Sequence, residues 1–159
     1  MALTVGTDTY VSLADCNAYH TALGNALWTG TDTAKEGALR KAAAYLDSHY
    51  RGRWKGIRAD RDQALAWPRE GVVDEDGYAV DPGSIPKVIR DACCEAALRM
   101  LSGEMEPDLA RGGRIESETV GEISVSYEDT APAGTSYPVI DNLLRGVLRS
   151  SGTVEMIRG

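Results

Sequence analysis

Cationic and aromatic residues are interleaved in one short stretch, Arg-Gly-Arg-Trp-Lys-Gly-Ile-Arg, at positions 51–58. Such a pattern can bind a single nucleic acid strand, because cations attract the phosphate backbone while the aromatic ring stacks on a base. The side chains that would do so are Arg51, Arg53, Trp54, Lys55 and Arg58. A solvated helix end with Trp54 turned inward is an equally good interpretation, so this stretch alone leaves nucleic acid binding open.

The charge of the chain is distributed unevenly around this stretch. Residues 51–69 hold six Lys and Arg residues against two Asp residues, a net charge of +4, while the whole chain carries −7. The remainder therefore carries −11. An acidic protein with one short basic segment is poorly suited to gripping a DNA backbone, since that affinity comes from many phosphate contacts. It could still surround DNA without holding it.

No catalytic constellation accompanies the basic stretch. His20 and His49 are the only histidines, and neither has a nucleophile motif beside it, so we interpret both as partly buried or surface side chains near helix ends. The glycines of Arg111-Gly-Gly-Arg114 lack the preceding strand and the Lys-Ser/Thr pair of a phosphate-binding loop. We therefore expect no catalytic residue, no enzymatic activity and no cofactor.

Metal sites are not expected either. The cysteines at positions 16, 93 and 94 and the two histidines lack the spacing of a zinc site, and buried, reduced thiols are the simpler interpretation. The segment Asp74-Glu-Asp-Gly77 lacks the regular ligand positions and the closing Glu of an EF-hand, which favours an exposed acidic turn.

Length and composition favour one globular domain. A chain of 159 residues, 43% of them hydrophobic, can bury a single core without metals or disulfides. No apolar run approaches the roughly 18 residues of a membrane span, and the N-terminus lacks the basic start and apolar middle of a signal peptide. We expect a protein that is made and kept in a cytoplasm.

Capping residues and apolar spacing predict three helices after an extended arm at residues 1–11. Ser12 caps the first helix, with Asp15 completing a capping box, and Gly24 ends it. Thr33 caps the second helix, which ends at the Arg-Gly-Arg of residues 51–53. The third helix starts at Pro86 and ends at Gly103. Its apolar stripe should form the centre of the core and is rich in small residues: Val88, Ile89, Ala92, Cys93, Ala96, Ala97, Met100 and Leu101.

The remaining segments predict a long connection, a hairpin and a last helix. Residues 51–83 form the connection, pinned to the core by Leu65 and Trp67. An alternation of apolar and polar residues at 123–128, after a weaker strand near 115–120, predicts a β-hairpin with one polar face. A short helix follows Tyr137-Pro138. The predicted fold is thus mainly α, a small bundle of about four helices with a β-hairpin inserted before the last, over residues 1–148, followed by a tail at 149–159.

Six short motifs, taken in order, resemble a family of tailed-phage proteins. They are Tyr10-Val-Ser12, Ala18-Tyr-His20, Tyr45-Leu-Asp47 with Tyr50, Gln63-Ala-Leu-Ala-Trp-Pro-Arg69, Ile85-Pro86 and Tyr137-Pro138. Together they cover most of the chain, and most of them are packing motifs. The chain resembles the head-tail adaptor proteins, also called head-completion or connector proteins, some of which are described as DnaT-like single-stranded DNA-binding proteins.

This resemblance implies a structural protein of the virion neck. Members of the family are small helical bundles with a protruding hairpin or loops, and they assemble as a ring, commonly dodecameric, beneath the portal. The implied partners are the portal protein, the next neck component (a stopper or tail terminator) and further copies of the chain. DNA would pass through the channel without specific binding, no membrane would be involved, and the protein would be made in the cytoplasm of a bacterial host. An acidic channel wall suits this function because it repels phosphate.

The C-terminal tail is the segment that we expect to dock on the portal. Its candidate contact residues are Arg149, Val154, Met156, Ile157 and Arg158. The apolar ones cannot build a core of their own, so the tail either frays or becomes ordered on a partner. The alternative function, from a different class, is a single-stranded DNA-binding replication accessory protein that uses the stretch at 51–58.

Overall fold

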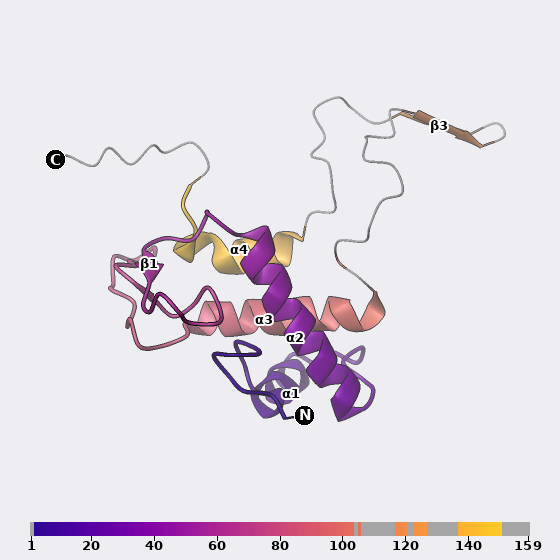
Figure 1. Ribbon diagram of the computed structural model, residues 1–159. Coiled ribbons are helices and arrows are strands. Elements are labelled where there is room, and N and C mark those ends of the chain that lie inside the picture. The colour runs from indigo at the N-terminus through magenta and orange to yellow at the C-terminus, as the bar shows by residue number, and fades with distance from the viewer. Residues whose placement is uncertain (1, 104, 106–116, 121–122, 127–136, 151–159) are drawn as a thin grey trace.

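The computed structural model describes residues 2–103, 105, 117–120, 123–126 and 137–150. The helices in this part of the chain are α1 (Leu13–Ala22), α2 (Asp32–His49), α3 (Lys87–Ser102) and α4 (Pro138–Leu144), followed by a 3-10 turn, η1 (Arg145–Val147). The strands are β1 (Ile57–Arg58), β2 (Arg69–Glu70), β3 (Ser117–Val120) and β4 (Ile123–Ser126). The prediction of a mainly α fold with four helices and a hairpin before the last is confirmed (Figure 1).

Helix α3 is the centre of the structure, and α1, α2 and α4 all contact it. Its buried face consists largely of small side chains, with Ala92, Cys93, Ala96 and Ala97 fully enclosed. Small residues at a helix interface let the neighbouring backbone approach closely, and α2, which crosses α3 in Figure 1, contributes a stripe of the same kind. The predicted position of the core is therefore confirmed.

The helix starts follow capping chemistry, with one correction. The Ser12 hydroxyl accepts from the backbone N–H of Asp15, as predicted for α1. For α2 the prediction of Thr33 as cap was wrong. Thr31 is the cap, its hydroxyl accepts from the N–H of Ala34, and Asp32 then stands in the first turn, where a negative charge is favourable. Pro86 is the residue just before α3.

The connection between α2 and α3 is held by a two-stranded ribbon too short to be visible in the sequence. Strands β1 and β2 are antiparallel, with Ile57 opposite Glu70 and Arg58 opposite Arg69. Gly56 has a positive φ of 67°, and a Cβ there would lie 2.1 Å from the Glu70 carbonyl oxygen, so only glycine fits. Leu65 and Trp67 are buried, which confirms that this connection is pinned to the core.

Strands β3 and β4 form the hairpin predicted between α3 and α4. They pair antiparallel from Ser117 opposite Ser126 to Val120 opposite Ile123. No other helix or strand of the described structure contacts them. The predicted strand residues 115–116 and Tyr127 lie outside the described residues.

The end of the described chain is fastened to the residues that follow α2. Ile140, Leu144, Val147 and Leu148 are buried, Leu148 pairs with Trp54, and the N–H of Arg149 donates to the Arg53 carbonyl at 2.7 Å. Residues 151–159, most of the predicted tail, lie outside the described residues.

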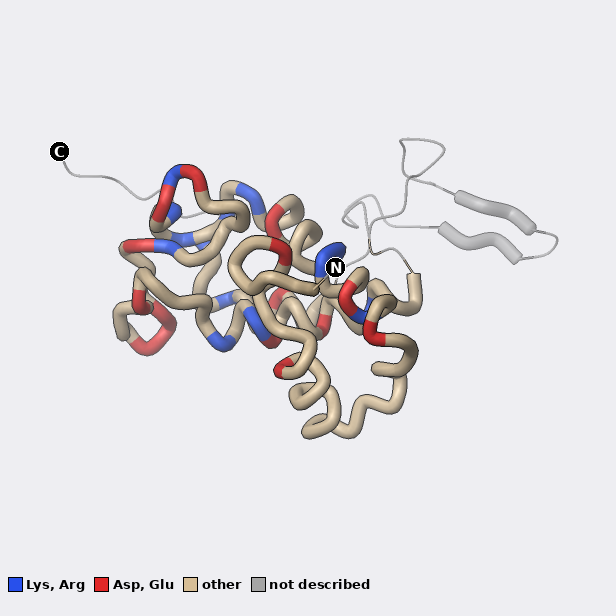
Figure 2. The backbone as a smooth tube through the Cα atoms, turned by 60° about the horizontal axis from the view of Figure 1, so that its bottom comes forward, with Lys and Arg blue, Asp and Glu red and all other residues tan. Residues whose placement is uncertain are grey.

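The described surface bears many charges. Acidic and basic positions are interspersed along the loops at the left of Figure 2. None of the helices in the described ranges is both long and apolar enough to cross a membrane. The three cysteines are buried, free thiols, as predicted, and burial raises the pKa of Cys93 to about 12.

The core assignment predicts that Ala96→Asp will prevent folding. An unpaired carboxylate in the α2–α3 contact costs several kcal/mol, a large part of the roughly 5–15 kcal/mol by which domains are stable. Ala44→Asp is the matched control, because Ala44 is exposed on α2 and the substitution should cost only the difference in helix propensity, up to about 0.7 kcal/mol. Urea unfolding followed by circular dichroism measures both. Equal stability of the two variants would contradict the assignment.

Candidate functional site

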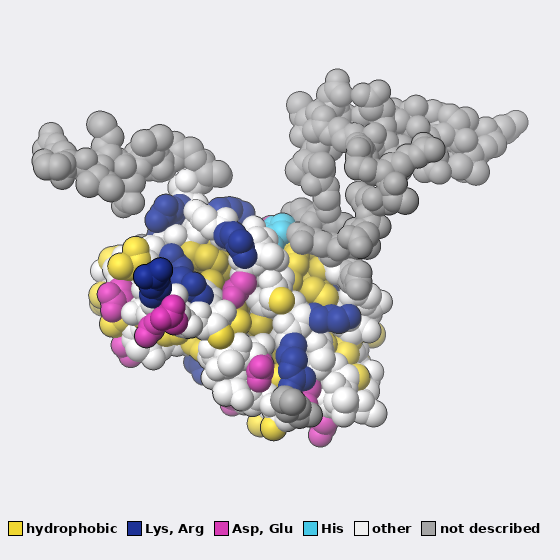
Figure 3. Space-filling view, in the orientation of Figure 1, with side chains coloured by type: hydrophobic (Ala, Val, Ile, Leu, Met, Phe, Trp, Pro, Cys, Tyr) yellow, Lys and Arg dark blue, Asp and Glu magenta, His cyan; other side chains and the backbone are white. Residues whose placement is uncertain are grey.

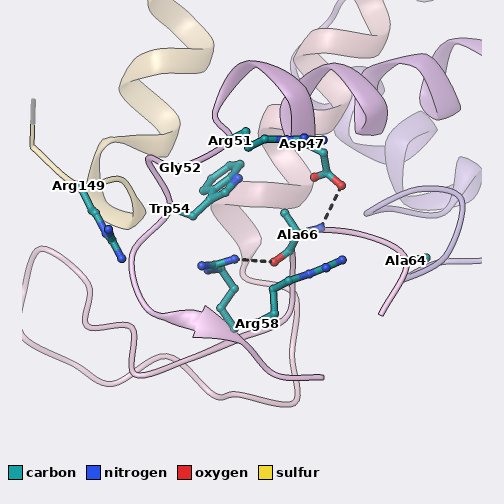
Figure 4. Close-up of a pocket in the computed structure, with 9 residues that line it drawn as sticks. Asp47, Arg51, Gly52, Trp54, Arg58, Ala64, Ala66 and Arg149 are labelled. Carbon is teal, nitrogen blue, oxygen red and sulfur yellow. Dashed lines mark hydrogen bonds between the residues drawn. The ribbon is translucent and has the colours of Figure 1, made fainter. Parts of the chain in front are cut away.

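A pocket of about 450 Å³ opens where α2 ends and the β1–β2 connection begins (Figure 4). Its walls come from four parts of the chain: the last turn of α2, the loop that leads into β1 together with β1, the segment that leads into β2 together with β2, and Arg149, two residues after η1. The lining residues are Asp47, Arg51, Gly52, Trp54, Arg58, Ala64, Ala66, Arg69 and Arg149. Four of the nine are arginines and one is an acid.

One wall of the pocket is fixed by the carboxylate of Asp47. One oxygen of that carboxylate accepts from the Tyr10 hydroxyl, and the other accepts from the N–H of Ala66 at 3.0 Å. The Ala66 N–H also donates to the Tyr10 hydroxyl oxygen at 3.1 Å. Tyr10 is completely buried. These bonds tie the N-terminal arm, α2 and the loop before Trp67-Pro68, a cis peptide, into one unit.

Burial dominates the electrostatics of this wall. It raises the pKa of Asp47 above its ordinary value, although hydrogen bonds from Tyr10 and Ala66 act in the opposite direction. The pKa of Tyr10 is raised as well, first by burial and then by the charge of Asp47. Both groups therefore have a structural role, because the Tyr10 hydroxyl and the Asp47 carboxylate are hydrogen-bonded to each other.

Two arginines of the pocket are held by backbone carbonyls instead of carboxylates. Arg69 donates to the carbonyls of Lys55, Ala66 and Gly56 at 2.7, 3.2 and 2.8 Å. Arg58 donates to the carbonyls of three residues in the same loop, Arg61, Gln63 and Leu65. Burial, and then the charges of Arg149 and Arg58, lowers the pKa of Arg69. These guanidinium groups shape the loop without having their charge neutralised.

The other two arginines, Arg51 and Arg149, are exposed at the rim. Among the described residues, neither side chain makes a hydrogen bond or ion pair. Figure 3 shows Lys and Arg side chains gathered over the part of the surface where β1 lies in Figure 1. The pocket thus carries a net positive charge of +3 in a protein whose total charge is −7.

The structure brings together part of the residue set proposed for nucleic acid binding. Arg51, Trp54 and Arg58 line the pocket, whereas Arg53 stacks its guanidinium on Tyr50 and Lys55 donates to the carbonyls of Val73 and Gly146. Trp54 is only 3% exposed, which corresponds to the interpretation in which it turns inward. Its ring therefore offers no free face to a base.

Of the candidate portal-docking residues, Arg149 lies within the described residues. Arg149 lines the pocket beside Arg51 and Arg58, a neighbour relation that the sequence did not indicate. The candidates Val154, Met156, Ile157 and Arg158 lie outside the described residues.

The two histidines occupy structural positions. His20 is 1% exposed, more buried than predicted, and both ring nitrogens have partners: Nε2 lies 3.1 Å from the Cys94 carbonyl and Nδ1 lies 2.9 Å from the Asn25 amide nitrogen. Because an amide N–H₂ only donates, Nδ1 accepts and Nε2 carries the proton, so the ring is neutral. His49 is exposed and stacks on Tyr45. No nucleophile–base pair is formed by either ring in the described structure.

Sequence reasoning missed two members of the site, Asp47 and Arg69. Asp47 was noted only as part of a motif, and Arg69 only as a charge and as the last residue of another motif. The available signal was the shared order of Tyr10, Asp47 and Ala66 in the motifs, since these three residues meet in space. Among the described residues, no three His, Cys, Asp or Glu side chains are grouped as metal ligands would be.

Comparison with known proteins gives one match. A family model with the description "Putative DnaT-like ssDNA binding protein" matches residues 2–159. No curated protein and no solved structure matches the chain.

The Asp47 wall predicts that Tyr10→Phe will destabilise the protein by about 1.5–3 kcal/mol, the range for hydrogen bonds to charged groups. The variant keeps the ring in the core but leaves one buried carboxylate oxygen without its donor. Tyr78→Phe removes a hydroxyl from a ring that is 72% exposed and should be neutral within about 0.5 kcal/mol. Chemical denaturation of both variants tests this, and a neutral Tyr10→Phe would show that the bond contributes nothing.

The buried neutral His20 predicts a loss of stability in mild acid. Burial lowers the pKa of His20 below its ordinary value, so below about pH 6.5 the unfolded chain binds a proton that the folded chain does not. The free energy of unfolding should therefore fall as pH drops through that range. His20→Gln should be less stable and flatter with pH, whereas His49→Gln, which leaves the buried ring in place, should keep the wild-type slope. A slope lost only in His49→Gln would contradict the assignment.

Proposed function

The chain belongs to the DnaT-like family, and we propose that it is a structural protein of the virion, a head-tail adaptor whose copies form a ring beneath the portal. The ring would extend the DNA channel and offer a docking surface to the next neck component, a stopper or tail terminator. The support comes from a hairpin that no other helix or strand of the described residues contacts.

The β3–β4 hairpin is the observation that carries the proposal. Its two strands pair with each other, and no other described helix or strand contacts them. An isolated two-stranded hairpin is marginally stable in water, so it needs a surface to pack against. A second copy of the same chain supplies such a surface at a fixed place. A contact between two different faces of identical subunits repeats around a ring when the rotation closes.

The helical body supports assembly through the hairpin instead of through a helix face. The apolar stripes of α2 and α3 are already buried against each other and against α4. Large obligate interfaces are usually hydrophobic, and these stripes leave little apolar surface for one. The isolated protein would then be a monomer or weak oligomer that becomes a ring on the portal.

The motifs that resemble the adaptor family serve packing in this structure. Tyr10 and Asp47 hold the loop at Ala66, Tyr50 donates to Asp141 at 2.7 Å, and Tyr45 meets Tyr137 edge to face at 6.2 Å. The acidic remainder of the chain agrees with a channel wall that lets DNA slide.

Single-stranded DNA binding is the second candidate, and the description of the matching family favours it. Because Trp54 is buried and Lys55 is engaged with two carbonyls, such a protein would hold a strand through Arg51, Arg53 and Arg58 without base stacking. Affinity that comes from phosphate contacts alone falls steeply with salt.

The test mixes the purified protein with the portal protein of the same phage and measures assembly by native mass spectrometry. Wild-type protein should form a ring on the portal. Replacing residues 117–126 by a Gly-Ser linker should preserve the Tm, since none of the described helices contacts β3 or β4, and abolish the ring. Deleting residues 150–159 should preserve the Tm and abolish attachment to the portal.

Two results would contradict the proposal. One is a hairpin-deleted protein that still assembles normally. The other is a wild-type protein that ignores the portal but binds an oligo-dT strand of about 20 nucleotides with steep salt dependence, which would favour the second candidate.

A further inference from the structure

The arginine pocket contains more positive than negative side chains, four arginines and one carboxylate. Its single carboxylate, Asp47, is occupied by the Tyr10 hydroxyl and the Ala66 N–H, so it does not pair with any of the four guanidinium groups. Asp47 offsets only one of the four positive charges, and the charges of Arg149 and Arg58 each make the protonated form of Arg69 less favourable. An arrangement of this kind is stabilised by binding an anion.

The four arginines that would bind this anion differ in how their side chains are held. Arg58 and Arg69 are fixed in place by carbonyl groups, and a guanidinium group has five N–H donors, so each keeps donors that its carbonyl bonds do not use. Arg51 and Arg149 stand at the rim with side chains that have no hydrogen-bond partner in the described structure. A ligand that enters the pocket would meet Arg58 and Arg69 in fixed positions, and the side chains of Arg51 and Arg149 could then turn toward it.

The indole of Trp54 adds an uncommitted donor. Its Nε1–H is buried and has no hydrogen-bond acceptor among the described residues. In Figure 4 the nitrogen edge of the ring faces the side of the pocket where Ala66 and Asp47 lie. Buried polar groups in proteins nearly always have a partner, but the Trp67 N–H outside the pocket lining is unpaired in the same way, so the case for an acceptor-rich ligand rests on the arginine cluster.

A phosphate group matches this site better than a carboxylate or a base. It can carry more than one negative charge and presents several acceptor oxygens around one atom, which suits several guanidinium groups at once. A volume of about 450 Å³ also exceeds what a single carboxylate fills. Stacking on a base would need an exposed aromatic face, and Trp54 presents none.

We infer that this pocket is a binding site for phosphate groups, held by the guanidinium groups of Arg51, Arg58, Arg69 and Arg149. The phosphate belongs either to a free small molecule or to a DNA strand. In both cases recognition is of the phosphate and is independent of base sequence. The site does not depend on ring formation, so it stands or falls separately from the adaptor proposal.

Isothermal titration calorimetry with pyrophosphate tests the site on the full-length protein. Wild-type protein should bind, and the double variant Arg51→Gln/Arg149→Gln should bind about tenfold or more weakly, because charge-assisted hydrogen bonds are the strong ones. Both side chains are exposed and unbonded, so the variant should keep the wild-type Tm. Arg90→Gln is the control, since Arg90 is exposed on α3 outside the pocket, and it should bind like wild type. A second substitution at Arg40 would remove as many charges as the double pocket variant does. Because Arg40 has contacts of its own, Arg90→Gln alone serves as the control.

Two further probes identify the source of the phosphate. If an oligo-dT strand without a terminal phosphate competes with pyrophosphate, the site takes the backbone of a strand. If only the 5′-phosphorylated strand or pyrophosphate binds, it takes a terminal or free phosphate. Both results support the inference. It is overturned if no phosphate probe binds, if Arg90→Gln weakens binding as much as the double variant, or if a hexaglutamate peptide binds more tightly than every phosphate probe.

Discussion

The partly buried carboxylate of Asp47 is the constraint on which the arm, the end of α2 and the loop before Trp67 depend. It lies in the last turns of α2 and accepts from groups more than 18 residues away on either side, the Tyr10 hydroxyl and the Ala66 N–H. Burial of a carboxylate is unfavourable unless its oxygens are hydrogen-bonded, so the arm and the loop must both be present for the group to be tolerated. Because Ala66 precedes Trp67, this arrangement also brings that large ring into the core. Hydrogen bonds from the Ala66 N–H to Asp47 and to the Tyr10 hydroxyl join the long connection to α2 and to the N-terminal arm.

The same loop is also held by two arginine side chains that donate hydrogen bonds to its backbone carbonyls. Arg58 and Arg69 sit opposite each other in the β1–β2 register and donate to carbonyls that the short ribbon leaves unpaired. Carbonyl groups satisfy the donors without cancelling the charge. Structural use of arginine therefore creates an electropositive pocket as a by-product, and the acidic balance of the rest of the chain makes this pocket the exceptional region of the surface.

The helices could be predicted from the sequence because their signals are local. The Ser12 cap, the apolar stripes and the Tyr137-Pro138 start were each visible within a few residues. The cap of α2 was misassigned because Thr31 and Thr33 are both plausible, and an acidic residue three positions after Thr33 imitated a capping box that the helix does not use. Strands of two residues show no period, so β1 and β2 were missed. The pocket could not be predicted, because residues that are far apart in the sequence line it. Asp47 and Arg69 are 22 positions apart, and Arg51 and Arg149 are 98 positions apart.

Helix α4 and η1 connect the two regions that have unmet interactions. The hairpin precedes this unit, whereas Arg149 follows it at the rim of the pocket. Between them, Ile140, Leu144, Val147 and Leu148 are buried, and Lys55 fastens η1 by donating to the Gly146 carbonyl at 2.7 Å. A head-to-tail assembly needs two different contact regions on each subunit, and in the proposed ring the hairpin that precedes α4 is one of them.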